Sequence, residues 1–149
     1  MMTHTILLVE DNPTDILLIQ RAFRREDLSH ISLQIVRDGE AAVFYLSGEG
    51  EYSDRERYPL PMLMLLDLKL PRRSGHEVLG WLRQQANLKR LPVLILTSSR
   101  ETMDINQAYE LGVNSYLVKP VGFRAFMEML NTLNLYWLIL NEPPEVQLS

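Results

Sequence analysis

The sequence predicts a doubly wound α/β domain built on five parallel strands. Five short apolar runs recur along the 149 residues, and apolar residues at helical spacing follow each of them. The most apolar runs do not alternate with polar residues, which is typical of strands buried on both faces of a parallel sheet. Right-handed crossovers between such strands place helices on both faces of the sheet. No repeat or change in composition indicates a second domain, so residues 1–141 are expected to form one domain.

The composition is that of an ordinary globular protein and argues against several functions. Hydrophobic residues make up 46% of the chain, and the net charge of -4 offers no excess positive charge for binding nucleic acid. The absence of cysteine excludes disulfides and thiolate metal sites. No run approaches the roughly 20 apolar residues that span a bilayer, and the first residues do not resemble a signal peptide. We therefore expect a soluble cytoplasmic protein that binds neither membrane nor nucleic acid directly.

The first predicted strand, residues 5–10, ends in the adjacent acids Glu10 and Asp11. Asn12 supplies an N-cap and Pro13 a first helical residue, and apolar residues then continue with helical spacing. A pair of carboxylates thus lies where the first strand meets its helix.

The second predicted strand, residues 31–36, leads to Asp38, which caps a second helix. The polar stretch 48–61 then forms a loop of greater than usual length. Such a loop is either functional or tolerated surface, and we favour tolerated surface.

The third predicted strand, residues 62–66, delivers Asp67 to its end, and Pro71 and Gly75 mark the loop to the next helix. A carboxylate is costly to bury without a partner. Asp67 therefore either binds a cation or takes part in a reaction, or it merely caps a turn.

The fourth predicted strand, residues 93–97, ends in Thr97, and the fifth, residues 115–118, is followed by Lys119. A helix over residues 101–111 connects them, since Gly112 is a typical helix stop.

Four of the five predicted strands therefore end in polar side chains that can do chemistry. In doubly wound sheets, ligands bind at the carboxyl ends of the strands, where the strand order reverses. The three carboxylates and the lysine have a net charge of -2, which one divalent cation matches, and oxygen ligands without His or Cys favour Mg²⁺. Asp67 could then attack a phosphoryl group, with the lysine and the Thr97 hydroxyl on its oxygens. No Walker A or kinase glycine loop is present, so ATP is not expected to be the direct donor.

These residues resemble the receiver domains of two-component response regulators. The resemblance rests on Glu10 and Asp11 after the first strand, LLDLKLPRRSG around Asp67, ILTSS with Thr97, and YLVKP with Lys119. It implies a flavodoxin-like sheet with the strand order 2-1-3-4-5, and it makes Asp67 the phosphoacceptor.

The resemblance also implies roles for the neighbours of Asp67. Asp11, Asp67 and the Lys69 backbone carbonyl would bind Mg²⁺, and Glu10 would assist through water. Glu10 departs from the aspartate that receivers often have there, which could alter the metal geometry.

The remaining roles implied by the resemblance concern the response to phosphate. Thr97 and Tyr116 would form the switch pair, and Lys119 would bind the phosphoryl group. Lys69 and Ser99 either set the lifetime of the phosphate by placing a water or are ordinary loop residues.

A narrower similarity points to the small response regulators of cyanobacterial phytochromes. It is carried by GEGEYSDRERYP, RQQANLKRLPVLILTSS and the final LNLYWL. It implies a histidine kinase partner of the phytochrome type. Nothing after the last helix resembles an output domain, so we expect a stand-alone, non-enzymatic regulator that signals through changed protein contacts.

The sequence leaves two alternatives to the function of a response regulator. A scaffold could keep the fold and work without phosphorylation, although it has no chemical need for this set of charges. A phosphatase of the haloacid dehalogenase type would also form an aspartyl phosphate. Such enzymes carry a second acid two residues after the nucleophile, where this chain has Lys69.

The final predicted helix, residues 122–140, carries two apolar stripes, and the tail 142–149 is expected to be disordered. A stripe for the core comprises Phe123, Phe126, Met127, Leu130 and Trp137, and an adjoining stripe comprises Met129, Leu133, Tyr136 and Leu140. A helix of a single domain rarely needs both, so we expect a homodimer through this helix. The alternative is that the tail or the first helix folds over the second stripe.

Overall fold

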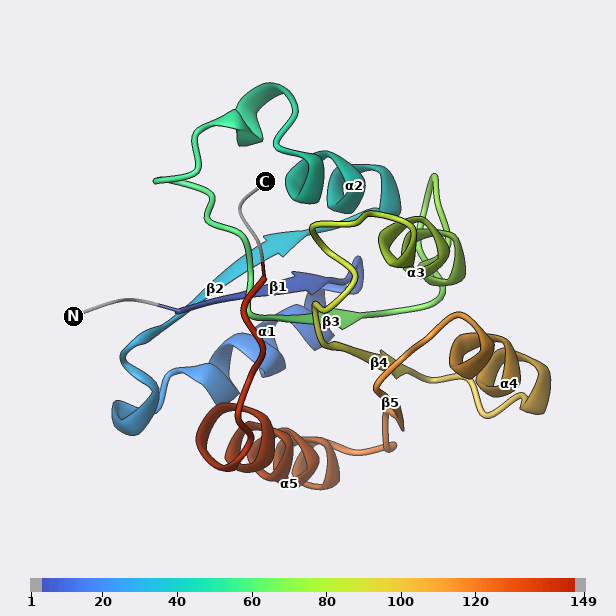
Figure 1. The fold of residues 1–149 in the computed structure, drawn as a ribbon. Helices are drawn as coiled ribbons and strands as arrows, with labels where there is room; N and C mark the ends of the chain where they lie inside the picture. The colour runs from blue at the N-terminus through green and yellow to red at the C-terminus, as the bar shows by residue number, and fades with distance from the viewer. Residues whose placement is uncertain (1–3, 147–149) are drawn as a thin grey trace.

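The protein is a five-stranded parallel sheet with helices on both faces, seen in a computed structural model that describes residues 4–146. The strands are β1 (His4–Val9), β2 (Ile31–Val36), β3 (Leu63–Leu66), β4 (Val93–Thr97) and β5 (Ser115–Val118). The α-helices are α1 (Pro13–Phe23), α2 (Gly39–Ser47), α3 (Gly75–Arg83), α4 (Thr102–Glu110) and α5 (Phe123–Asn134). The strand order is β2-β1-β3-β4-β5, which confirms the predicted fold class (Figure 1).

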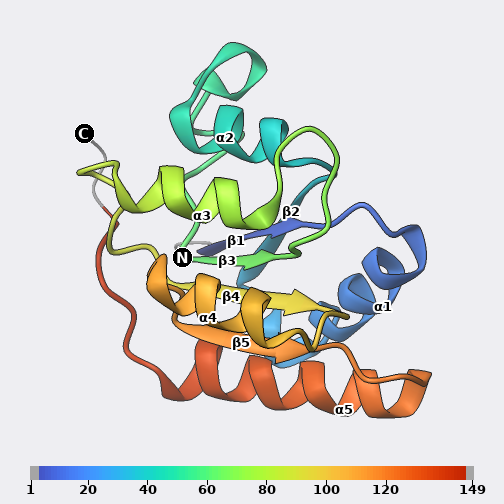
Figure 2. The same cartoon turned by 90° about the vertical axis from the view of Figure 1, so that its right-hand side faces the viewer.

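The core consists of two apolar layers, one on each face of the sheet. Helices α1 and α5 cover one face, and α2, α3 and α4 supply the layer on the other face (Figure 2). Every residue of β3 and β4 is buried, whereas the edge strands β2 and β5 are largely half-buried. The continuous apolar runs therefore predicted the central strands to within one residue, because both faces of these strands are covered.

Local sequence signals fix where the helices begin. The Asn12 side chain accepts a hydrogen bond from the backbone N–H of Asp15 at 3.0 Å, and the Asp38 side chain accepts one from Ala41 at 2.7 Å. Both predicted N-caps are therefore confirmed. Each cap satisfies an amide that the first turn of a helix leaves without a partner, and it sets the direction in which the helix leaves the sheet.

The final helix differs from the prediction in two respects. Its α-helical part ends at Asn134, and the chain continues to Leu140 as a π-helix. The assignment of its stripes was also partly wrong: Phe123 is 53% exposed, whereas Leu133 is only 5% exposed and belongs to the core. Leu133 lies three residues after Leu130 and therefore projects from nearly the same side of the helix.

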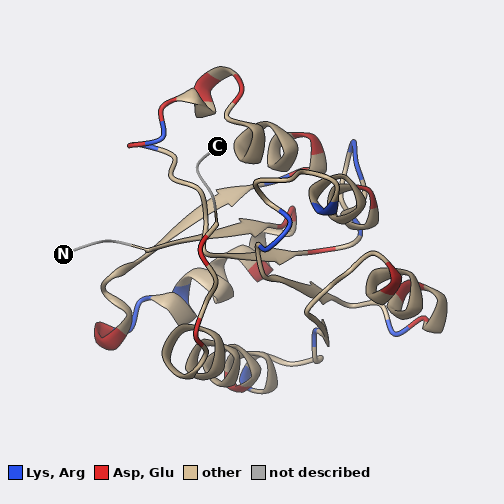
Figure 3. Ribbon diagram, viewed as in Figure 1, with Lys and Arg blue, Asp and Glu red and all other residues tan. Residues whose placement is uncertain are grey.

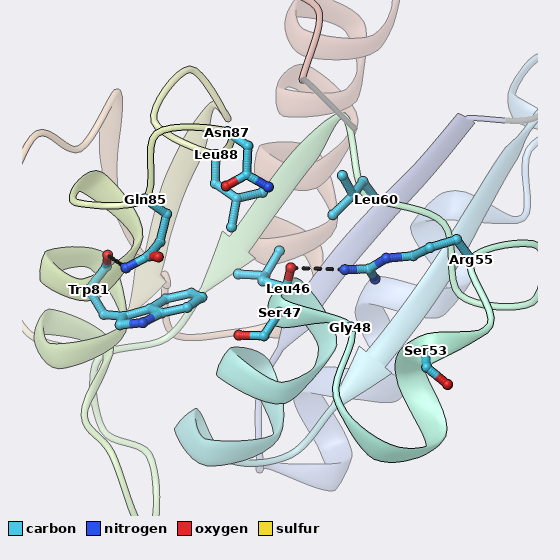
Figure 4. Close-up of a pocket in the computed structure, with 10 residues that line it drawn as sticks. All are labelled: Leu46, Ser47, Gly48, Ser53, Arg55, Leu60, Trp81, Gln85, Asn87 and Leu88. Atoms are coloured by element: carbon cyan, nitrogen blue, oxygen red, sulfur yellow. Dashed lines mark hydrogen bonds between the residues drawn. The ribbon is translucent and has the colours of Figure 1, made fainter. Parts of the chain in front are cut away.

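The loop over residues 48–61 is folded onto helix α2. A short 3₁₀-helix (Gly50–Ser53) opens it. The Arg55 guanidinium donates hydrogen bonds to the carbonyls of Tyr45, Leu46 and Tyr58, at 2.7, 2.9 and 3.2 Å. Arg55 thus satisfies backbone groups at the end of α2 and ties the loop to it. A cavity of about 410 Å³ between this loop and the end of α3 contains none of the predicted site residues (Figure 4).

Replacing Arg55 by Ala is expected to lower the free energy of unfolding by about 2–3 kcal/mol, because three partly buried carbonyls lose their donor. For a chain of this length the Tm should fall by roughly 4–12 °C. Thermal unfolding measures the effect, with Arg90→Ala as the control because Arg90 is exposed. Equal Tm values for the two variants would contradict this role of Arg55.

Beyond the π-helix, residues 142–146 have no regular secondary structure. This segment leaves α5 and crosses beside the amino ends of the strands toward the α2 and α3 layer (Figures 1 and 2). Val146 packs against the core layer on that face. Residues 147–149, the remainder of the predicted disordered tail, lie outside the described residues. Within the described chain, no helix is long and apolar enough to cross a membrane.

Candidate functional site

The predicted functional residues meet at one edge of the sheet. Glu10 and Asp11 follow β1, Asp67 follows β3, Thr97 ends β4, and Lys119 follows β5. Figure 3 shows acidic residues in red where β1 and β3 end and a basic residue in blue where β5 ends. The chain runs from β1 to β2 on one side and continues at β3 on the other, so the strand order reverses between β1 and β3. The site therefore lies where doubly wound sheets bind ligands.

Three carboxylates form a group that could hold a metal ion. One oxygen from each of Glu10, Asp11 and Asp67 lies within 4.8 Å of the others. Glu10 and Asp67 are buried, whereas Asp11 is exposed and leaves one side of the group open to solvent. A set of hard oxygen ligands with access for water fits Mg²⁺, which keeps several waters in its shell.

Lys119 joins this group to α1. Its Nζ donates to Glu10 Oε1 at 2.6 Å, to Asp15 Oδ2 at 2.8 Å and to Asp67 Oδ2 at 3.2 Å. The lysine side chain is 10% exposed. An ammonium group has three N–H donors, so all of them have a carboxylate acceptor. The sequence did not predict Asp15, because an acid in the first turn of a helix has a sufficient local explanation in the helix dipole.

The close contact between Glu10 and Lys119 changes the pKa values of both. Burial raises the pKa of the Glu10 carboxyl to about 7, although the hydrogen bond from Lys119 lowers it. Burial lowers the pKa of Lys119, but its hydrogen bonds to Asp15 and Glu10 outweigh this effect and raise that pKa above its ordinary value. Lys119 therefore remains an ammonium group throughout the physiological range.

Asp67 is held in a fixed orientation with one oxygen facing the charged groups. Its Oδ1 accepts a hydrogen bond from the backbone N–H of Leu68 at 2.7 Å, and its Oδ2 accepts from Lys119. Gly75, at the start of α3, lies so close to the Asp67 carbonyl that a Cβ on this residue would overlap with it. The predicted Gly75 turn thus lets α3 pack directly against the backbone that presents Asp67.

Thr97 and Tyr116 are connected through Ser99. Thr97 is fully buried, and its hydroxyl lies 3.5 Å from the Ser99 amide, the limit of a hydrogen bond. The Tyr116 hydroxyl donates to the Ser99 carbonyl at 3.0 Å, and the Ser99 hydroxyl donates to Asp104 in α4. Sequence reasoning missed Asp104, since its link to Ser99 depends on the position of α4. Lys69, whose side chain is exposed, lies in the loop after β3.

This combination of fold and side chains defines a response regulator receiver domain, and the chain belongs to that family. The family model of the response regulator receiver domain matches residues 6–131. The predicted family is therefore confirmed.

The chain is similar to regulators of phytochrome signalling in particular. It is 42% identical over 133 residues to response regulator Rcp1 of Synechocystis sp., covering 89% of this chain and 88% of Rcp1. The crystal structure of the phosphorylated cyanobacterial phytochrome response regulator RcpA superimposes with a TM-score of 0.91 at 37% identity, covering 96% of this chain and 99% of RcpA. The Mn²⁺-bound form of Rcp1 gives a TM-score of 0.89 at 39% identity, covering 95% of this chain and 99% of the other. The narrower predicted similarity is confirmed as well.

Proposed function

We propose that the protein is a phosphorylation switch in which Asp67 accepts a phosphoryl group from a histidine kinase. An oxygen of Asp67 attacks the phosphorus of a phosphohistidine, the P–N bond breaks, and the histidine leaves with the electron pair and takes up a proton. The observation that carries the proposal is the position of Asp67, which belongs to the group of carboxylates that could hold a metal ion and also accepts a hydrogen bond from the ammonium of Lys119.

Glu10, Asp11 and Asp67 are the side chains that would hold Mg²⁺, together with the Lys69 carbonyl. Bound Mg²⁺ would neutralise charge on the phosphoryl oxygens. The oxygen donor set of the described residues supports this choice. The Mn²⁺-bound form of the similar Rcp1 supports a divalent cation at the site.

The response to phosphate would pass from β4 and β5 to α4. Lys119 would donate to a phosphoryl oxygen, and the Thr97 hydroxyl would do the same. Because Thr97, Ser99 and Tyr116 are neighbours in the structure, a movement of Thr97 would disturb the hydrogen bond from Tyr116 to Ser99. The link from Ser99 to Asp104 would carry that change into α4. The output is then an altered protein surface, without an enzymatic reaction of its own.

The phosphodonor is proposed to be a phytochrome-type histidine kinase in the cytoplasm, because RcpA is a cyanobacterial phytochrome response regulator. The basic test is incubation of the purified protein with acetyl phosphate, with and without Mg²⁺, followed by intact-mass spectrometry. We expect a mass gain of one phosphoryl group that requires Mg²⁺. A protein that stays unmodified with acetyl phosphate and with a phosphorylated kinase would support the phosphorylation-independent scaffold instead.

The affinity for Mg²⁺ is expected to depend on pH through Glu10. Because the pKa of this carboxyl is raised from 4.5 to about 7, protons compete with the cation at neutral pH. The affinity should fall by about tenfold per unit as the pH drops below 7. In the metal-free protein, the raised pKa means that protonated Glu10 contributes to the free energy of unfolding. This contribution should be fully present below pH 4.5 and lost as the pH rises through 7.

Calorimetric titration of Mg²⁺ at several pH values, repeated with Glu10→Gln, measures this pH dependence. The glutamine variant should bind more weakly but show a flatter pH profile between pH 6 and 8. Identical profiles for the two proteins would contradict the assignment to Glu10.

We also propose a homodimer through the end of α5. Four apolar side chains there are between 48% and 63% exposed: Leu135, Tyr136, Ile139 and Leu140. Tyr136 also lines a groove of about 440 Å³, together with Leu117, Met129 and Trp137. Residues 129–141 contain no charged side chain, and Glu128 is the charged residue that lines the groove, so a second copy could pack on the end of α5 with few like charges facing one another. The second predicted stripe therefore remains the proposed dimer interface, although Leu133 belongs to the core instead.

Combining Tyr136→Glu with Leu140→Glu is expected to weaken the dimer by about 2–4 kcal/mol, because two charges would have to be buried in the interface. Analytical ultracentrifugation with and without beryllofluoride measures the association. Leu17→Glu is the matched control, since Leu17 is 63% exposed on α1. A wild-type protein that is monomeric in both states would refute the dimer.

A further inference from the structure

Asp15 contacts the lysine of the site but does not belong to the group of carboxylates that could hold a metal ion. The oxygens that lie within 4.8 Å of one another come from Glu10, Asp11 and Asp67. Asp15 instead pairs with Lys119 from the side of α1, at 2.8 Å. This distance is shorter than the 3.2 Å between Lys119 Nζ and Asp67 Oδ2.

The backbone holds Asp15 in this position. Its N–H donates to the Asn12 side chain, which is the N-cap of α1. Its side chain is 21% exposed and points back to the end of β5, which is 104 residues away in the sequence. An acid whose only role was to stabilise the first turn would not need this long-range contact.

A divalent cation would divide the acceptors of Lys119 into two classes. Glu10 and Asp67 would face the cation with their negative charge, and their attraction for the ammonium would fall. The charge of Asp15 lies outside the metal-binding group, so it would remain available to Lys119. Asp15 would then be the partner that keeps the lysine in place when a cation occupies the site.

We propose that Asp15 is a positioning residue that holds the Lys119 ammonium beside Asp67, so that one N–H remains directed at the incoming phosphoryl group. The longest of the three contacts, to Asp67, is the one that a phosphoryl oxygen replaces. The contact to Asp15 persists in both states. This role rests on the proposed function, because it serves the phosphoryl contact of Lys119.

The test compares the binding of beryllofluoride, a phosphoryl analogue, to variants in the presence of Mg²⁺. In Asp15→Ala the apparent affinity should fall by about tenfold, the order expected for one hydrogen bond between charged groups. Asp15→Glu should recover part of the loss. In a Lys119→Ala background, Asp15→Ala should have no further effect, because Asp15 acts through the lysine. Titrations followed by amide NMR spectra give the affinities.

Three results would overturn the proposal. The first is an affinity of Asp15→Ala for beryllofluoride that equals that of the wild type. The second is that Asp15→Ala lowers this affinity equally with and without Lys119, which would indicate a general effect of charge or folding. The third comes from the NMR signal of the Lys119 ammonium in Mg²⁺ alone. This signal should be sharp in the wild type and lost through fast proton exchange in Asp15→Ala, and an unchanged signal would show that Asp15 does not hold the lysine. Because this measurement needs no phosphoryl group, it separates a failure of the Asp15 role from a failure of the proposed function.

Discussion

Asp67→Asn is expected to abolish phosphorylation. An amide oxygen is a far weaker nucleophile than a carboxylate, and the substitution also removes one of the three carboxylates that would bind Mg²⁺. The fold should persist, because the Asn side chain is nearly the same size and its oxygen can still accept the hydrogen bond from the Leu68 amide. After incubation with acetyl phosphate and Mg²⁺, intact-mass spectrometry should show a phosphorylated wild type and an unmodified variant.

Asp38→Asn provides a matched control for this experiment. Asp38 also follows a strand, β2, and Asn replaces Asp as an N-cap with little loss of stability. This variant should be phosphorylated like the wild type. Equal labelling of wild type and Asp67→Asn, or a phosphorylated peptide that excludes residue 67, would refute the assignment of the phosphoacceptor.

The sequence was sufficient to predict the strands and the residues at their ends. Strands β1, β3 and β4 are buried on both faces, so their apolar runs have few alternative explanations. Parallel strands bring their carboxyl ends to one edge, and the grouping of Glu10, Asp11 and Asp67 then follows from topology. The prediction worked here because each side chain directly follows a strand.

Features that depend on contacts between distant segments could not be predicted in the same way. Asp15 meets Lys119, and Ser99 meets Asp104, only after α1 and α4 have packed. In the sequence, Arg55 is an ordinary residue of a polar loop, and its contacts form only when the loop folds back onto α2. Leu133 was misassigned because helical periodicity gives the direction of a side chain but not how wide a stripe the sheet covers.

Lys119→Ala is expected to have two separable effects, one on stability and one on signalling. Without the lysine, Glu10, Asp15 and Asp67 lose the cation that all three contact. Removing one partner from buried ion pairs of this kind costs about 3 kcal/mol, which corresponds to a fall in Tm of roughly 6–12 °C in the presence of EDTA. Mg²⁺ should restore much of the loss, since it supplies positive charge to Glu10 and Asp67.

The signalling effect should remain when Mg²⁺ has restored stability. A bound metal replaces the charge of Lys119 but not its N–H donor on the phosphoryl oxygen. Saturating beryllofluoride should therefore shift the amide NMR signals of residues around Tyr116 and in α4 of the wild type. In Lys119→Ala, few of these signals should shift. Lys89→Ala is the control, because Lys89 is an exposed lysine outside the site. A full wild-type response in Lys119→Ala would show that another group reads the phosphoryl oxygen, and the role of Lys119 would then be confined to balancing charge in the unphosphorylated site.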